Sequence, residues 1–184
     1  MATASKSRTL VTGILLAVLL LLLAVKTFFI GFYRIPQNGM YPGLPAGSSI
    51  FTSKRAYSSA TDVKRGDIII FVREENSQRY IYVWRVIALP GEKVEASGDT
   101  LKINGQTVQR QRVREADGRT VFREEIGNTA YEIAIGPGSE VQPPNVSITV
   151  PPDSFFVLGD NRDDARDSRY VGPVQFSSIL GRKL

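Results

Sequence analysis

The hydrophobic pattern divides the chain into one long apolar run and a series of short apolar stretches. Residues 10–25 are almost entirely Leu, Val, Ile and Ala, and the apolar character continues past Lys26 to Tyr33. About twenty apolar residues cross a bilayer core, and a lysine near the end of such a run can extend its amine to the interface. The pattern predicts a cytoplasmic tail over 1–9, a transmembrane anchor over 10–32 and a folded domain over 33–184.

A cleaved signal peptide is the alternative interpretation of the N-terminus, since a basic start followed by an apolar run fits both. No small-x-small cleavage site follows the run, so we expect an uncleaved anchor. Lys6 and Arg8 favour a cytoplasmic N-terminus, which would place the domain outside, whereas Lys26 and Arg34 on the other flank oppose that orientation.

The rest of the chain is expected to form a mostly β domain. Short stretches rich in β-branched and aromatic residues alternate with turn residues, and outside the anchor no stretch keeps a helical period over three turns. Asn104-Gly105 predicts a hairpin on a type I′ turn, and polar, turn-rich residues 97–139 predict a smaller β-rich insertion. The predicted strands are 49–52, 67–72, 80–87, 100–103, 106–108, 131–135, 146–150 and 155–158.

Composition limits the chemistry that the domain can perform. The 184 residues carry a net charge of +5 and contain neither cysteine nor histidine. Disulfides, thiolate nucleophiles, Ser-His-Asp triads and His- or Cys-based zinc sites are therefore excluded, and any general base must be Lys, Asp, Glu or Tyr. The arginines alternate with acids over residues 110–125, which is typical of a solvated surface and not of a nucleic-acid interface.

Three motifs follow the apolar run in order. The first is Ile35-Pro36 through Met40-x-Pro42 to Leu44-x-x-Gly47, the second is Arg85 to Glu92, and the third is Gly159 to Gly172. Together they resemble the bacterial type I signal peptidases, membrane-bound serine endopeptidases that remove signal peptides with a Ser-Lys dyad. The resemblance covers essentially the whole chain and implies the β-rich signal peptidase fold on the outer face of the cytoplasmic membrane.

The resemblance also implies where the catalytic residues should lie, and there this chain departs from the family. The nucleophilic serine of the family precedes the methionine of the first motif, where this chain has Gly39. The general-base lysine precedes the second motif, where this chain has Trp84. The serine that orients the lysine corresponds to Ala165. Because a hydroxyl nucleophile needs an adjacent base, these changes predict an inactive homologue with no catalytic residue at the family positions.

An active peptidase with a non-standard nucleophile is the alternative. Ser48 and Ser49 are the nearest hydroxyls after Gly39, but we expect them to cap a turn or face solvent. The lysines that remain outside the anchor and tail are Lys54, Lys64, Lys93, Lys102 and Lys183, and the sequence places none of them at the required position.

The third motif is rich in acids, namely Asp160, Asp163, Asp164 and Asp167. It lacks the ligand spacing, the glycine and the closing glutamate of a calcium-binding loop. We therefore expect a structural motif in which Arg162, Arg166 and Arg169 pair with these acids and pin the loop to the sheet, with no metal and no cofactor.

Three functions remain open. The first is an inactive homologue that binds the extended C-region of signal peptides by strand addition along Tyr80 to Trp84, or that partners an active signal peptidase or the export machinery. The second is an active peptidase, and the third is a structural subunit whose groove Trp84 fills. The expected partners are membrane lipid and preproteins. The expected binding residues are Gln37, Asn38, Gly39, Met40, Ile81, Val83 and Trp84.

Overall fold

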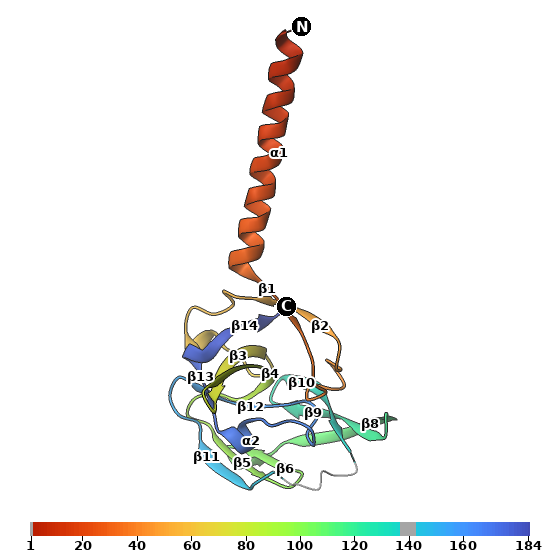
Figure 1. Ribbon diagram of the computed structural model, residues 1–184. Coiled ribbons are helices and arrows are strands. Elements are labelled where there is room, and N and C mark those ends of the chain that lie inside the picture. The colour runs from red at the N-terminus through yellow and green to blue at the C-terminus, as the bar shows by residue number, and fades with distance from the viewer. Residues whose placement is uncertain (1, 137–142) are drawn as a thin grey trace.

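A long N-terminal helix, α1, stands on a β-rich domain (Figure 1). The computed structural model describes residues 2–136 and 143–184. Helix α1 covers Ala2–Phe29, and its segment Val11–Phe29 is long and apolar enough to cross a membrane. The 19 residues of that segment rise about 28 Å, close to the thickness of a bilayer core. Residues 30–32, which the predicted anchor includes, belong to the first strand instead.

Seven strands form the main sheet, in the order β1-β2-β14-β3-β4-β12-β13. Every pairing in it is antiparallel, which allows one face to be packed and the other to be solvated. Strand β1 leaves α1 directly and pairs with β2, so the helix feeds straight into the sheet edge. The strands are β1 (Ile30–Arg34), β2 (Ser49–Ser53), β3 (Ile68–Glu75), β4 (Gln78–Ala88), β12 (Ser154–Leu158), β13 (Val174–Gln175) and β14 (Ile179–Lys183).

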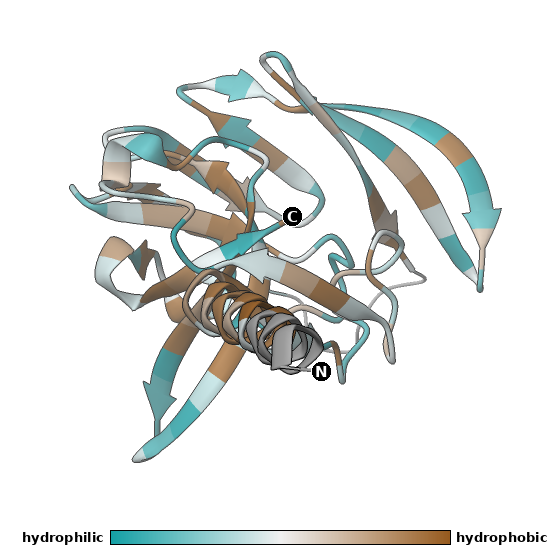
Figure 2. Ribbon diagram, turned by 90° about the horizontal axis from the view of Figure 1, so that it is seen from above, coloured by the Kyte–Doolittle hydropathy of each residue, from teal (hydrophilic) through white to brown (hydrophobic). Residues whose placement is uncertain are grey.

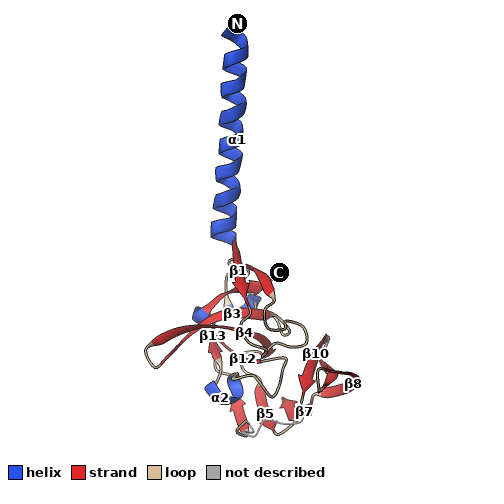
Figure 3. Ribbon diagram, turned by 45° about the vertical axis from the view of Figure 1, so that its right-hand side comes forward, coloured by secondary structure: helices blue, strands red, loops and turns tan. Residues whose placement is uncertain are grey.

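In the described part of the chain two smaller sheets complete the domain, and the helical segments outside α1 are short (Figure 3). The four-stranded sheet has the order β11-β5-β6-β7 and the three-stranded sheet the order β10-β9-β8. Their strands are β5 (Lys93–Ser97), β6 (Thr100–Ile103), β7 (Gln106–Thr107), β8 (Gln109–Ala116), β9 (Arg119–Ile126), β10 (Thr129–Ile135) and β11 (Val146–Thr149). The short helices are Ala60–Asp62, α2 (Ser168–Val171) and Phe176–Ser178.

The mostly β prediction is confirmed, and the hairpin at Asn104-Gly105 has positive φ at both residues, as a type I′ turn requires. Within the predicted insertion over 97–139, strands β8, β9 and β10 form the three-stranded sheet. Strands β6 and β7 lie inside that range, yet they share the four-stranded sheet with β5 and β11, which lie outside it.

Strands β4 and β12 connect two hydrophobic clusters. Brown segments in Figure 2 mark apolar residues on α1 and alternating along the strands. All five residues of β12 are buried: Phe155 and Val157 face one cluster, while Phe156 and Leu158 face the other. Because successive side chains of a strand point to opposite faces, a strand between two cores is apolar on both faces, as Phe155 to Leu158 are.

A buried polar network joins the three-stranded sheet to the loop that follows β12. Glu124 on β9 is fully buried and accepts two hydrogen bonds from Arg162, at 2.8 and 2.5 Å. Arg110 and the Tyr131 hydroxyl donate to the same carboxylate at 2.8 and 2.6 Å. Burial disfavours the charged form of Glu124, but attraction and hydrogen bonds from Arg162 outweigh it and lower its pKa to about 2.

A second ion pair links the network to the main sheet. Arg85 on β4 donates to both carboxylate oxygens of Asp160, at 2.7 and 2.6 Å, and its guanidinium lies 4.4 Å from the centroid of the Tyr131 ring. The loop after β12 is therefore held from two sides, by β4 and by β9.

We expect Glu124→Gln to lower the free energy of unfolding by about 3–5 kcal/mol at neutral pH, because it leaves Arg162 buried without its counter-charge. The folded pKa of about 2 lies below the unfolded value of 4.5, so this contribution is complete above pH 4.5 and lost as pH falls toward 2. Denaturant unfolding of both proteins between pH 7 and pH 2 measures the difference. The adjacent Glu125→Gln, on an exposed pair with Arg123, should change stability by less than about 1 kcal/mol. Equal losses from the two variants would contradict the assignment.

Candidate functional site

The first motif forms a loop that is closed by the backbone N–H and C=O groups of Ile35. The Ile35 N–H donates to Ser48 O at 2.8 Å, and the Ile35 carbonyl accepts from Gly47 N–H at 2.7 Å. Gly47 has φ of +85°, which suits glycine and lets the chain turn back into β2. Within the loop Met40 is buried and bridges to Leu44, so the neighbouring Gly39 is fixed at the edge of the hydrophobic core.

The third motif holds Gly39 from the other side. Asn161 donates from its backbone N–H to Gly39 O at 3.1 Å and from Nδ2 to Asn38 O at 3.0 Å. Asn161 itself follows Asp160, which pairs with Arg85. The position of Gly39 therefore depends on the buried ion pairs through one short stretch of backbone.

Trp84 occupies the space beside Gly39. A Cβ placed on residue 39 would lie 2.5 Å from Cη2 and 2.6 Å from Cζ3 of the Trp84 indole, closer than real Cβ atoms approach. Gly39 does not have a positive φ, so its backbone conformation would accept any residue. Only the steric crowding by Trp84 requires glycine at this position. Trp84 is only 6% exposed and belongs to the main hydrophobic cluster. Glycine at 39 and tryptophan at 84 are thus complementary in shape.

Gly159 and Ala165 complete the contact. A Cβ at residue 159 would overlap the Ala165 Cβ and lie 2.5 Å from Gly39 O and 3.1 Å from Trp84 Cζ3. Ala165 is 3% exposed. The structure therefore brings Gly39, Trp84 and Ala165 together around Gly159, although they come from three separate motifs.

A groove with a volume of about 670 Å³ runs alongside this cluster. One wall is the first motif with the end of β1, and the other is β4 with the β3–β4 turn. Tyr82 lies between Phe71 and Trp84, with ring centroids 5.7 and 6.1 Å away. The side chains or backbone of Tyr33, Arg34, Ile35, Pro36, Gln37, Gly39, Met40, Glu75, Asn76, Tyr80, Ile81, Tyr82, Val83, Trp84, Asp164 and Arg166 line it.

The charged residues of the groove are mostly paired with protein groups. Glu75 accepts from Tyr82 Oη at 3.2 Å and lies 3.7 Å from Arg166, while Asp164 accepts from Arg119 at 2.7 Å. Burial, and then the charge of Glu75, raise the pKa of Tyr82, so its hydroxyl remains protonated and acts as a donor.

The backbone of β4 faces the groove with unused hydrogen-bonding groups. Strand β12 pairs with β4 only over Arg85–Ala88, so among the described residues the second edge of β4 is free from Gln78 to Trp84. Val86 exchanges both its hydrogen bonds with Gly66 and Asp67 beside β3. Because backbone direction alternates along a strand, the N–H and C=O groups of Ile81 and Val83 point away from β3, along the free edge.

The predicted pairing within the acidic motif is partly wrong. Arg169 does pair with Asp167, at 2.8 Å, but Arg162 pairs with Glu124 and Arg166 with Glu75. Asp160 pairs with Arg85, and Asp163 and Asp164 lie near Arg119. The partners come from other strands because a buried loop is held by groups across it, which spacing along the chain cannot show. Within the described residues no group of three acids is arranged to hold a metal ion.

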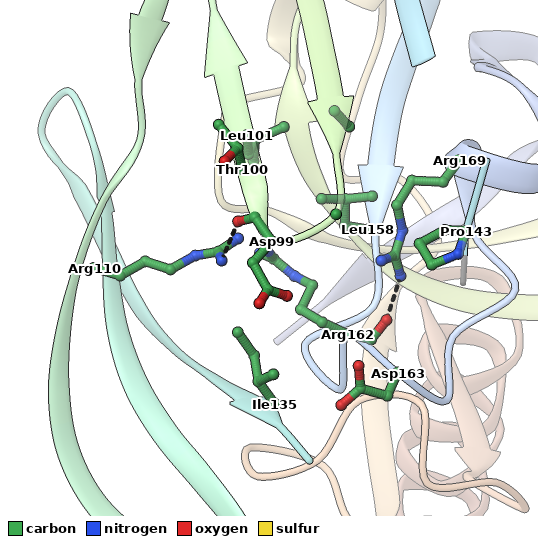
Figure 4. Close-up of a pocket in the computed structure, with 12 residues that line it drawn as sticks. Asp99, Thr100, Leu101, Arg110, Ile135, Pro143, Leu158, Arg162, Asp163 and Arg169 are labelled. Atoms are coloured by element: carbon green, nitrogen blue, oxygen red, sulfur yellow. Dashed lines mark hydrogen bonds between the residues drawn. The ribbon is translucent and has the colours of Figure 1, made fainter. Parts of the chain in front are cut away.

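A second hollow lies on the far side of Arg162, between β6, β8 and the third motif (Figure 4). Its volume is about 20 Å³, enough for a single water molecule. Arg110 donates to Asp99 O at 2.5 Å, and Arg169 donates to Arg162 O at 2.7 Å. These guanidinium groups are satisfied by protein, so the hollow is a packing gap within the buried network.

Six of the seven expected binding residues line the groove, and Asn38 does not. Its side-chain oxygen instead accepts from Ala46 N–H at 3.2 Å and stabilises the loop. Glu75 and Asn76, which the three motifs do not predict, also reach the groove through the β3–β4 turn. Their signal was the hydrophobic-to-polar change at the end of β3, which indicates a projecting hairpin.

The sequence profile of "Signal peptidase, peptidase S26" matches residues 7–184. The chain belongs to this family. Signal peptidase I T of Bacillus subtilis (strain 168) is 33% identical to it, over 92% of this chain and 79% of that protein. Signal peptidase I of Pseudomonas aeruginosa is 30% identical, over 90% of this chain and 67% of that protein.

Among solved structures, a signal peptidase I from Enterococcus faecalis V583 is 32% identical, covering 65% of this chain and 95% of that one, with a TM-score of 0.39. In this signal peptidase homologue the three motifs converge on one point: the first supplies Gly39, the second adjoins Trp84, and the third supplies Gly159 and Ala165.

We expect Gly39→Ala to destabilise the protein by about 1–3 kcal/mol, because the new methyl group overlaps the Trp84 indole. In a Trp84→Leu background the same substitution should cost less than about 0.5 kcal/mol, since the indole is gone. Thermal unfolding of the four proteins in detergent, followed by circular dichroism, gives the coupling. Gly43→Ala is the control in the same loop, because its Cβ would meet nothing closer than 3.9 Å. Equal costs of Gly39→Ala in both backgrounds would refute the overlap.

Proposed function

We propose that this member of the signal peptidase family is a membrane-anchored homologue that binds extended signal-peptide segments without cleaving them. The observation that carries the proposal is the Trp84 indole in contact with Gly39, at the point where the three motifs converge. By resemblance, the family places its nucleophile at residue 39, its general base at residue 84 and the group that orients the base at residue 165.

The three groups needed for acyl transfer are all missing at these positions. Glycine has no side chain that attacks a carbonyl, and alanine cannot hydrogen-bond to a base. The indole N–H of tryptophan is a donor only, so Trp84 cannot accept a proton. Loss of a nucleophile or base typically lowers kcat by several orders of magnitude. The site would retain substrate binding at most.

Among the described residues, no neighbouring side chain is placed to replace the missing nucleophile or base. The groove-lining residues include no Ser, Thr or Lys in the part of the chain that the structure describes. Ser48 donates its hydroxyl to Pro45 O at 2.7 Å, and Ser49 is exposed on β2. Lys54 donates to Thr27 O at the end of α1, and Lys93 pairs with Glu95. These contacts support inactivity over a rearranged dyad.

The groove supports the binding half of the proposal. On one wall Ile81 and Val83 present free backbone groups, and on the other Gln37 makes no backbone hydrogen bond among the described residues. A peptide strand lying between them would gain main-chain hydrogen bonds on both sides, as in strand addition. The family acts on signal peptides, so the C-region of a preprotein is the natural occupant.

The apolar helix α1 is consistent with a membrane anchor. We place the protein in the bacterial cytoplasmic membrane as a single-pass protein, with the β domain on the outer face. There it would meet exported preproteins, an active signal peptidase or the export machinery.

Purified full-length protein should not cleave a preprotein in detergent, because it lacks a nucleophile and a base. The triple variant Gly39→Ser, Trp84→Lys, Ala165→Ser should cleave at the small-x-small site at least about 10³-fold faster. Gly39→Ser alone should stay silent, because Trp84 leaves no room and no base is present. Mass spectrometry of the products identifies the cleaved bond.

Cleavage by the natural chain at a defined site would refute inactivity, provided that a substitution in this chain abolishes it. The first substitutions to make are Ser48→Ala and Ser49→Ala. Loss of cleavage in that pair would identify the non-standard nucleophile.

Binding should slow hydrogen exchange along the free edge of β4. A synthetic signal-peptide C-region at saturating concentration should protect the Ile81 and Val83 amides about tenfold or more, since these point into the groove. The Tyr82 amide, which points toward β3, should not change and serves as an internal control. Measurement by NMR or mass spectrometry on the full chain distinguishes the residues. Unchanged exchange at Ile81 and Val83 would favour a structural subunit that binds no peptide.

A further inference from the structure

The end of helix α1 is surrounded by positive charge. Lys26 lies in its last turn, and the corner after β2 brings Lys54 and Arg55 to the same point. The Lys54 N–H donates to Phe29 O at 2.9 Å, and Lys54 Nζ donates to Thr27 O at 2.8 Å. Lys54 therefore caps the helix, where unpaired carbonyls and the helix dipole favour a cation.

Arg55 and Arg34 extend this set. The Arg55 guanidinium lies 5.5 Å from the centroid of the Phe29 ring, at the last residue of α1. Arg34 ends β1 and lies on the same face of that strand as Ile30 and Phe32. We call Lys26, Arg34, Lys54 and Arg55 the junction collar.

Among the described residues the collar has no carboxylate partner. Within residues 2–136 and 143–184, no ion pair includes any of its four members. The first acidic residue in the chain is Asp62, so no acid precedes or adjoins these four residues in the sequence. Elsewhere in the domain most arginines face an acid, as at Arg85 and Arg162. Within the part of the chain that the structure describes, the collar is therefore positive charge without a protein counter-charge.

An exposed aromatic face adjoins the collar. In the β1–β2 pair Phe32 lies opposite Phe51, with ring centroids 5.4 Å apart, and Ile30 lies on the same side. Phe32 is 61% and Phe51 59% exposed, whereas Ile50 and Thr52 on the other side are buried. A water-facing strand pair would normally carry polar residues at these positions. We call Ile30, Phe32 and Phe51 the aromatic face.

We propose that the junction collar and the aromatic face form a binding site for anionic phospholipid, with the collar on the phosphate groups and the aromatic face in the headgroup–acyl boundary. The apolar span ends at Phe29, so both features begin where the hydrocarbon core ends. Lys26 lies inside that span, and its amine can extend to the polar interface, where lipid phosphate groups lie. The inference rests on the proposed anchoring by α1 and not on peptide binding.

Binding at these two features would fix the orientation of the domain on the bilayer surface. Capping by Lys54 and stacking by Arg55 join α1 to β2, while the aromatic face enters the interface beside the helix. The groove, which begins at Tyr33 and Arg34 of the same strand, would then open next to the membrane surface.

The first test measures lipid selectivity of the full-length chain by native mass spectrometry from detergent. Phosphatidylglycerol should be retained in preference to phosphatidylcholine. Lys26→Gln combined with Arg55→Gln should weaken phosphatidylglycerol binding about 25-fold, because each basic residue near an anionic surface contributes about fivefold in affinity. Lys102→Gln combined with Arg123→Gln is the matched control, because it removes two exposed cations from β6 and β9 and should retain the preference.

Equal retention of the two lipids by the natural chain, or equal losses in the two double variants, would overturn the proposal. Competition by millimolar inorganic phosphate would show recognition of phosphate alone and would overturn the assignment to lipid. Circular dichroism of each variant verifies folding.

The second test locates the aromatic face and does not depend on the collar variants. The natural chain contains one tryptophan, the buried Trp84, so Phe51→Trp adds a single exposed reporter. In nanodiscs with brominated phosphatidylcholine, fluorescence of Phe51→Trp should be quenched well beyond that of the natural chain. Lys102→Trp, on β6, controls for a reporter placed elsewhere. Quenching no greater in Phe51→Trp than in Lys102→Trp would refute contact with the bilayer.

Discussion

The ion pair between Arg162 and Glu124 determines where the rest of the site can lie. An unpaired carboxylate or guanidinium in a protein interior costs several kcal/mol, so the fully buried Glu124 and its partner must meet. Their meeting holds the loop after β12 against the three-stranded sheet. Asn161, the residue before Arg162, then carries its amide groups to Asn38 and Gly39. The cluster around Gly39 is thus positioned from a sheet that does not line the groove.

Much of the fold follows from local pattern, and the exceptions have physical causes. Strands with buried β-branched and aromatic residues, such as β3, β4 and β12, are visible in the sequence. Strands β8 and β9 are not, because β8 is mostly exposed and its arginines pair with acids on β8, β9 and β10 instead of marking a buried face. The sequence predicts residues 30–32 of β1 as part of the anchor, because the exposed Ile30 and Phe32 continue the apolar run. An apolar residue that faces lipid or a membrane surface resembles one in a span.

The candidate site, too, could be predicted from the sequence only in part. The convergence of Gly39, Trp84 and Ala165 was expected from family resemblance, because nothing local relates residues 45 or more positions apart. The partners of the acidic loop could not be derived, since Arg85, Arg119 and Glu124 come from other strands. Long-range ion pairs depend on tertiary placement, whereas hairpin turns such as Asn104-Gly105 depend only on neighbours in sequence.

The fit between Gly39 and Trp84 also restricts the paths by which this sequence can change. A side chain at residue 39 cannot enter while the indole is present, and removing the indole first leaves a cavity that costs about 3–5 kcal/mol. Each single step thus lowers stability, and only the combined change relieves both problems. The effects of substitutions at residues 39 and 84 are therefore coupled. Whichever of the two residues is replaced first, the single variant is less stable than the starting protein. Drift at these two positions is therefore expected to be slow, even where no chemistry selects for them.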